Sequence, residues 1–242
     1  MSKKNLFKIN LFILCVFFIF IFLNKILANQ YKRPNRIGIV YWHGDLSQKK
    51  IALTFDDGPN ELYTRQILDI LKKYKVKATF FLIGKNVEAF PLVAKRIAED
   101  GHCIGNHTYT HPDLFLQTRK QIEYQIKNTE DIIRKATGVL TYLFRPPYGV
   151  DDHLVFMEAE KLGYIIVKWS LTGGTGESDK IIKKILSYVE NGAIILLHDG
   201  NRLSKNSNRS QVVKALPVII ESLQKEGYIL VTVPELLSLA DR

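Results

Sequence analysis

The stretch IALTFDDGPN, residues 51–60, runs as an apolar segment into two adjacent carboxylates, Asp56 and Asp57. Residues 51–55 have the short apolar pattern of a buried β-strand, and the Gly and Pro at 58 and 59 end it. Two neighbouring negative charges repel each other, and a surface turn gives no reason to place both there. The pair therefore raises the question of what the rest of the chain places beside the end of this strand.

Short runs rich in β-branched and aromatic residues alternate along the chain with amphipathic helical segments. The expected strands are 51–55, 77–83, 102–106, 141–145, 164–169, 192–198 and 228–233. Helical periodicity is clearest in 61–75, 117–137 and 211–226. This alternation predicts an α/β fold with a mostly parallel sheet and helices outside it. Because no Gly-rich phosphate loop follows the first strand, a closed or nearly closed barrel is favoured over an open dinucleotide-binding sheet.

Several of the helical segments end just before a glycine, which suits a left-handed helix C-cap. These glycines are Gly101, Gly138, Gly163, Gly192 and Gly227.

The composition is that of a globular protein with a sizeable core: 242 residues, 46% hydrophobic and 24% charged. The formal net charge is +10, and the basic residues are scattered along the chain. Such an excess is most often a solvated basic surface, and otherwise indicates nucleic acid, an anionic membrane face or an anionic polymer as a partner. Since no zinc-finger, helix-turn-helix or RNA-binding signature is present, a nucleic-acid partner is not expected.

The N-terminal residues 1–28 have a basic start, an apolar run at 11–23 and a small residue at Ala28. This order is typical of a secretory signal peptide. The apolar stretch from 6 to 27 also approaches the ~20 residues that span a bilayer, so a transmembrane anchor remains an alternative. Either way the sequence predicts a protein that is secreted or membrane-anchored and works outside the cytoplasm.

Residues 29–36 are expected to form a polar linker, and residues 37–242 an exported domain. Cys103 is alone in that domain. No internal disulfide is therefore expected, and the core has to hold the domain together. We expect a monomer.

Polar residues close several of the expected strands. In a barrel with parallel strands, residues at the carboxyl ends of the strands face one common site. The set comprises Asp56, Asp57, His107, Arg145, Trp169 and His198.

His111 follows His107 by four residues. On a helical turn, side chains at i and i+4 share one face and can hold one metal ion. With a strand-end Asp, the two histidines predict a two-His, one-carboxylate site that leaves positions open for water and substrate. One of the two acids would bind the metal, and the other would stay free as a general base.

Four motifs, TFDDGP, HTYTH, RPPYG and LLH, in this order and at these separations, resemble those of the polysaccharide deacetylases (carbohydrate esterase family four, NodB homology domain). The resemblance covers roughly residues 36–240. It implies a distorted (β/α) barrel with seven strands and a divalent metal, usually zinc, with cobalt or a similar ion able to substitute.

The resemblance also implies a role for each matching residue. Asp57, His107 and His111 would bind the metal, Asp56 would be the general base, Arg145 would hold that base, and His198 would be the general acid. Substrate contacts would come from Pro147, Trp169, the Tyr148 backbone N–H at the oxyanion, and Leu196 at the acetyl methyl.

The segment after Trp169 departs from the family pattern. Thr172 stands where an Asp that pairs with the catalytic histidine is expected. Without that carboxylate the pKa of His198 is expected to be lower than with it, which predicts a lower rate or a more acidic optimum. Glu177 or Asp179 could substitute if the Gly-rich loop folds inward. The stretch 201–208, after His198, is expected to be a flexible insertion at the mouth of the barrel.

The expected function is removal of N-acetyl groups from an extracytoplasmic N-acetylglucosamine-type polysaccharide. Peptidoglycan is the first expected substrate, chitin-like oligosaccharide the second and O-acetylated xylan the third. The alternative from another class is a wall-glycan-binding module of the same fold with weakened catalysis, which the departure at Thr172 favours.

Overall fold

The computed structural model describes residues 40–204 and 208–239. The predicted signal or anchor segment 1–28 and the predicted linker 29–36 lie outside these residues. Within the described ranges, no helix is long and apolar enough to cross a membrane.

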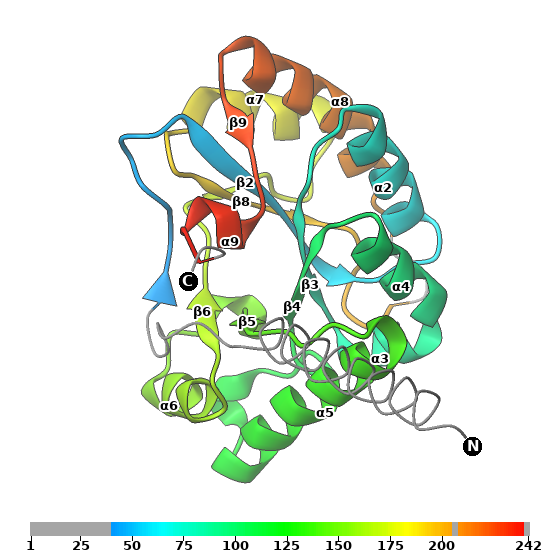
Figure 1. Cartoon of the computed structure of the whole chain (residues 1–242), viewed down its shortest axis with the longest axis vertical. Coiled ribbons are helices and arrows are strands. Elements are labelled where there is room, and N and C mark those ends of the chain that lie inside the picture. The colour runs from blue at the N-terminus through cyan, green and yellow to red at the C-terminus, as the bar shows by residue number, and fades with distance from the viewer. Residues whose placement is uncertain (1–39, 205–207, 240–242) are drawn as a thin grey trace, which may run out of the picture. The chain divides into compact units, whose positions relative to one another are not determined.

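A curled sheet of parallel strands forms the centre of the domain (Figure 1). Its order is β1-β6-β5-β4-β3-β2-β8-β7, and β9 pairs with β2 beside this path. The bounds are β1 (Val40–Tyr41), β2 (Lys50–Gly58), β3 (Thr79–Leu82), β4 (Cys103–Asn106), β5 (Leu143–Phe144), β6 (Ile165–Val167), β7 (Leu171–Thr172), β8 (Ile194–His198) and β9 (Ile229–Leu230).

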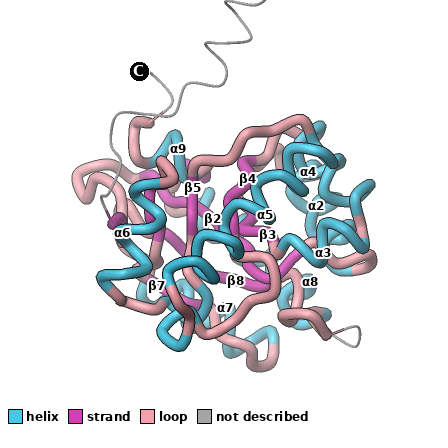
Figure 2. The backbone as a smooth tube through the Cα atoms, turned by 90° about the horizontal axis from the view of Figure 1, so that it is seen from below, coloured by secondary structure: helices cyan, strands magenta, loops and turns pink. Residues whose placement is uncertain are grey.

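Helices surround the strands, as the view in Figure 2 shows. They are α2 (Tyr63–Lys73), α3 (Gly84–Ala89), α4 (Pro91–Glu99), α5 (Arg119–Thr137), α6 (His153–Lys161), α7 (Ser178–Tyr188), α8 (Ser210–Lys225) and α9 (Val233–Leu236). Two short 3-10 turns, Leu114–Leu116 and Pro147–Gly149, lie in the connections.

The predicted α/β class is confirmed, and each of the seven predicted strands overlaps a strand of the sheet. The predicted barrel closure and strand count are wrong. The sheet is an open half-barrel with β1 and β7 at the ends of the strand order, and the described residues form nine strands. The two strands that were not predicted, β1 and β7, have two residues each. Such short strands show no alternation in a sequence.

The concave side of the sheet is filled mainly by its own side chains and by α9. Phe81, Val167 and Ile194 pack there with Val233 and Leu236 of α9. The predicted C-cap glycines all adopt positive φ, from 74° at Gly192 to 86° at Gly227. The packing of α9 against the sheet leaves the carboxyl ends of the strands to the polar residues of the cavity.

Candidate active site and metal centre

A β-bulge at the end of β2 brings both acids into one cavity. Successive residues of a regular strand point to opposite faces of the sheet. Here the pairing of β2 with β3 shifts register between Asp56 and Gly58, and Asp57 adopts a left-handed φ of 74°. Both carboxylates are buried and line the same cavity of about 290 Å³. A left-handed non-glycine residue is strained, and such strain is found most often at functional sites.

The two predicted histidine ligands follow β4, although not on a helix as the four-residue spacing predicted. Thr108 and His111 have φ values of 68° and 57°, so the segment is a loop. The Gln125 Oε1 of α5 accepts hydrogen bonds from the backbone N–H groups of Tyr109 (2.8 Å) and Thr110 (2.9 Å). Because a side chain satisfies these donors, the loop needs no helical hydrogen bonds to bring His107 and His111 together.

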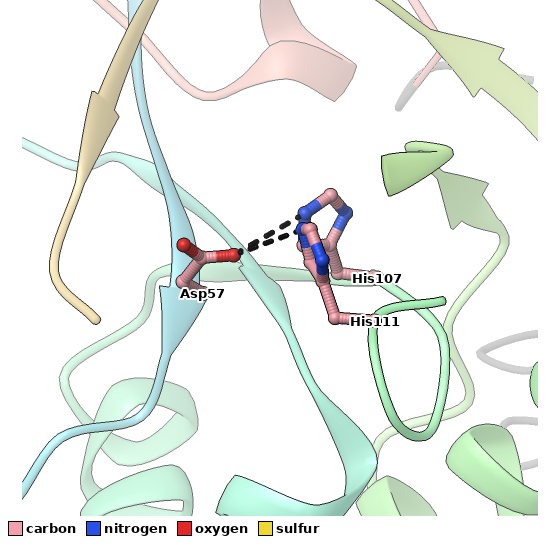
Figure 3. A group of neighbouring side chains, drawn as sticks. All are labelled: Asp57, His107 and His111. Atoms are coloured by element: carbon pink, nitrogen blue, oxygen red, sulfur yellow. Dashed lines mark ion pairs between the residues drawn. The ribbon is translucent and has the colours of Figure 1, made fainter. Parts of the chain in front are cut away.

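Asp57, His107 and His111 converge on one point (Figure 3). Asp57 Oδ1 lies 3.6 Å from His107 Nε2 and 3.3 Å from His111 Nε2, and the three candidate ligand atoms lie within 4.8 Å of one another. Asp57 Oδ1 is buried and has no hydrogen-bond partner among the described residues. A buried carboxylate oxygen without a donor fits a site where a cation would satisfy it.

The protonation states of Asp57, His107 and His111 also fit a metal site. Burial lowers the pKa of His107 and of His111 to about 4, so both imidazoles are neutral at pH 7. Burial alone would raise the pKa of Asp57, but the neighbouring histidines lower it below its usual value. Neutral imidazoles and a carboxylate are the forms that ligate a divalent metal. His107 Nδ1 donates to the Arg145 carbonyl at 2.7 Å, which directs Nε2 toward the site.

Asp56 is held by a buried guanidinium. Arg145 Nη1 donates to Asp56 Oδ1 at 2.7 Å and to Thr54 Oγ1 at 2.8 Å. The other guanidinium nitrogens donate to the carbonyls of Val167 (3.0 Å) and Lys168 (2.9 Å). Burial raises the pKa of Asp56, and the Arg145 charge opposes that effect. This arrangement supports an oriented carboxylate beside the candidate metal ligands.

His198 ends β8 directly beside Asp56, with which it pairs across the β2–β8 ladder. Its Nδ1 is buried and has no hydrogen-bond partner among the described residues. The Thr172 hydroxyl instead accepts a hydrogen bond from the Gly174 N–H at 3.2 Å. Glu177 and Asp179, which could have substituted for the expected Asp, do not partner this nitrogen. Burial lowers the pKa of His198, against the raising effect of Asp56 and Asp57.

The cavity wall contains three of the four residues predicted to contact substrate: Tyr148, Trp169 and Leu196. Pro147 is buried and does not line the cavity, whereas Pro146 does. Tyr148 has a φ of 57° inside the 3-10 turn. The turn therefore presents Pro146 and Tyr148 to the cavity and leaves Pro147 beneath them.

The cavity also contains residues that sequence reasoning did not single out. They are Gly149, Thr175, Asn201, Arg202 and Arg209, in addition to Pro146. Three of these six, Asn201, Arg202 and Arg209, lie after β8, in or next to the stretch 201–208, which was predicted only as an insertion. Their place in the sequence could have indicated them. The stretch 201–208 follows soon after His198, so it lies at the same edge of the sheet as the other site residues.

Two residues outside the cavity wall also position its parts. Asn86 Nδ2 donates to the carbonyls of Asp57 and Arg202, both at 2.8 Å. Lys168 is buried and its Nζ donates to the carbonyls of Gly149 and Val150. The Asn86 bonds fix the end of β2 relative to the loop after β8, and the Lys168 bonds fix the loop after β5 relative to the end of β6.

The sequence is similar to known polysaccharide deacetylases. A family model described as "Polysaccharide deacetylase" matches residues 43–167. The chain is 38% identical over 205 residues to a peptidoglycan-N-acetylglucosamine deacetylase of Bacillus cereus, and the match covers 83% of this chain and 93% of that protein.

Two solved structures are similar to this chain in both fold and sequence. A peptidoglycan N-acetylglucosamine deacetylase matches with a TM-score of 0.77 and 37% identity, over 82% of this chain and 92% of that one. A CE4 family pseudoenzyme from Bacillus anthracis matches with a TM-score of 0.76 and 29% identity, over 82% and 69%.

Proposed function

Because this chain belongs to the polysaccharide deacetylase family, we propose that it removes N-acetyl groups from peptidoglycan outside the cytoplasm. By homology the protein is a polysaccharide N-deacetylase, a hydrolase of carbon–nitrogen bonds. The observation that carries the proposal is the convergence of Asp57, His107 and His111 beside the Asp56–Arg145 pair. The Bacillus cereus relative supports peptidoglycan as the substrate over chitin-like oligosaccharide or O-acetylated xylan.

The residues present fit a divalent metal, for which we propose zinc held by Asp57, His107 and His111. When bound there, such an ion supplies Lewis-acid chemistry, polarising a carbonyl and lowering the pKa of water. Asp56 accepts the proton of the attacking water, since its carboxylate lies beside the triad and Arg145 keeps it oriented. Asp56 Oδ2 is 3.8 Å from His107 Nε2, which places the base next to the ligand set.

His198 protonates the leaving amine, because an amide anion is too poor a leaving group to depart unprotonated. Its position across the ladder from Asp56 puts acid and base on adjacent strands. The Tyr148 backbone N–H donates to the developing oxyanion, a type of contact often worth about 3 kcal/mol. Leu196 and Trp169 line the wall that receives the acetyl group and the sugar.

The test is release of acetate from purified peptidoglycan by the purified protein, with added zinc and after treatment with a chelator. We expect release with zinc and none after chelation. Neutral chitooligosaccharide and acetylated xylan serve as comparison substrates and rank the three glycans. If a different glycan is the better substrate, the peptidoglycan assignment is wrong.

A second candidate is a wall-glycan-binding module of the same fold with weakened catalysis. The buried His198 Nδ1, which has no partner within residues 40–204 and 208–239, favours it, as does the likeness to a pseudoenzyme. The intact triad and the Asp56–Arg145 pair argue against it. Metal binding and glycan binding without acetate release at any pH would establish this second candidate.

The N-terminal residues give the proposed location. We propose that 1–28 act as a signal peptide or membrane anchor, that 29–36 link it to the domain 37–242, and that the protein is a monomer at the cell wall. The mass of the mature protein from membrane and secreted fractions distinguishes the two fates of the segment. A full-length protein found only in the cytoplasm would contradict the proposal.

A further inference from the structure

A second cavity of about 550 Å³ adjoins the one that holds the acids and histidines. Asn201 and Arg202 belong to the wall of both cavities, so the two are neighbours. The rest of the second wall comes mainly from α3 and its C-terminal neighbour, including Lys85, Asn86 and Phe90, and from the loop after β8. A cavity of this size is in the range of small-ligand sites. The second cavity therefore lies next to the candidate active site.

The charged side chains that line the second cavity are positive. Lys85 and Arg202 line it, and no Asp or Glu of the described ranges does. Both side chains are exposed, and neither forms an ion pair with another described residue. The nearby acid of α3, Glu88, is outside the wall and accepts a hydrogen bond from the Tyr109 hydroxyl at 3.1 Å. Two cations without acidic partners in one hollow favour an anionic ligand.

The position of Arg202 relative to the candidate metal ligands is fixed. Asn86 Nδ2 donates to both the Asp57 carbonyl and the Arg202 carbonyl at 2.8 Å. The Arg202 guanidinium lies 4.9 Å from the centroid of the Tyr148 ring, a cation–π contact that orients it at the boundary between the cavities. A guanidinium held this way can bind a carboxylate with two parallel hydrogen bonds.

We propose that the second cavity is a subsite for the sugar that neighbours the one being deacetylated, and that it recognises a carboxylate carried by that neighbour. The inference rests on the proposed function, since it assumes a glycan in the first cavity. In peptidoglycan the carboxylate belongs either to the lactyl group of the neighbouring muramic acid or to its peptide. The subsite makes the enzyme select an anionic glycan over a neutral one of equal length.

The test uses a peptidoglycan tetrasaccharide with free lactyl carboxylates and the same tetrasaccharide with those groups converted to neutral amides. The measured quantity is the ratio of kcat/KM for the two forms. We expect the carboxylate form to be preferred by the unchanged enzyme. The ratio should fall about threefold in Lys85→Gln and about fivefold in Arg202→Gln, the size expected of exposed charge pairs. A third substrate with a peptide on the lactyl group tells the two sources of the carboxylate apart.

Lys72→Gln is the matched control, because Lys72 is exposed on α2 and lies outside both cavity walls. It removes the same charge and should leave the ratio as in the unchanged enzyme. Lys85 is exposed, so its replacement tests the inference even if Arg202→Gln fails to fold. A ratio near one in the unchanged enzyme, or a ratio that neither variant lowers, overturns the subsite. Absence of acetate release from every substrate instead overturns the proposed function.

Discussion

Replacing Arg145 with Met tests the central claim about the base, that a buried guanidinium holds Asp56. Arg145 is fully buried and its guanidinium makes four hydrogen bonds, one of them to the Asp56 carboxylate at 2.7 Å. Removing one partner of a buried ion pair costs about 3–5 kcal/mol, because the other charge is left uncompensated. We therefore expect Arg145→Met to lower the free energy of unfolding by that amount.

A double-variant cycle assigns the loss to the pair. In Asp56→Asn/Arg145→Met neither charge of the pair is left, so the double variant should be more stable than Arg145→Met by about 2 kcal/mol. The unfolding free energies come from urea titration with a chelator present, which removes any contribution of bound metal. Arg134→Met is the control, since the Arg134–Asp131 pair is exposed and should contribute less than about 1 kcal/mol.

Two results would refute this reasoning. A loss below about 1 kcal/mol in Arg145→Met would mean that the Asp56 charge does not depend on the guanidinium. A double variant no more stable than Arg145→Met would mean that Arg145 acts only through its bonds to Thr54 and to the carbonyls of Val167 and Lys168.

Three further predictions concern the base, the acid and a histidine remote from both. Asp56→Asn should abolish acetate release and retain one equivalent of zinc by metal analysis, whereas loss of the metal would mean that the roles of the two acids are exchanged. Thr172→Asp should extend activity to higher pH in a pH–rate profile, because β7 pairs with β8 and a carboxylate that bonds His198 Nδ1, which has no partner among the described residues, raises the pKa of His198; an unchanged profile in a folded variant counts against this. Burial lowers the pKa of His102 to about 4, so its neutral native form loses stability as pH falls from about 6.5 to about 4, by roughly 2–3 kcal/mol. His102→Gln should show a smaller fall in urea titrations at these two pH values, and equal falls would contradict the assignment.

The residues at the strand ends could be predicted from sequence because the physics is local. An apolar run that stops at a charged or aromatic residue marks the carboxyl edge of a buried strand. Asp56, Arg145, Trp169 and His198 were found in this way, and the structure places all four at or directly beneath one cavity.

The rest of the site depends on backbone conformations that a sequence pattern does not encode. Strict alternation would have sent Asp56 and Asp57 to opposite faces, and only the bulge places both in the cavity. The spacing of His107 and His111 suggested a helical turn, yet the loop is held by Gln125 from a helix that begins eight residues after His111. Arg202 enters the cavity through a loop with no periodicity to read.

The base Asp56 and the acid His198 differ in how neighbouring residues hold them. Arg145 positions two residues of the site. Its guanidinium donates a hydrogen bond to Asp56, and its carbonyl accepts one from His107 Nδ1. The base and one ligand are thus fixed by a single residue, and a shift of β5 would disturb both together. His198 has no comparable support, because its Nδ1 is buried and no residue in the described part of the chain bonds it. A buried polar atom without a hydrogen-bond partner costs free energy of folding. His198 is therefore less firmly held than Asp56. Loss of catalysis in such a site would therefore begin at His198 and leave metal binding intact.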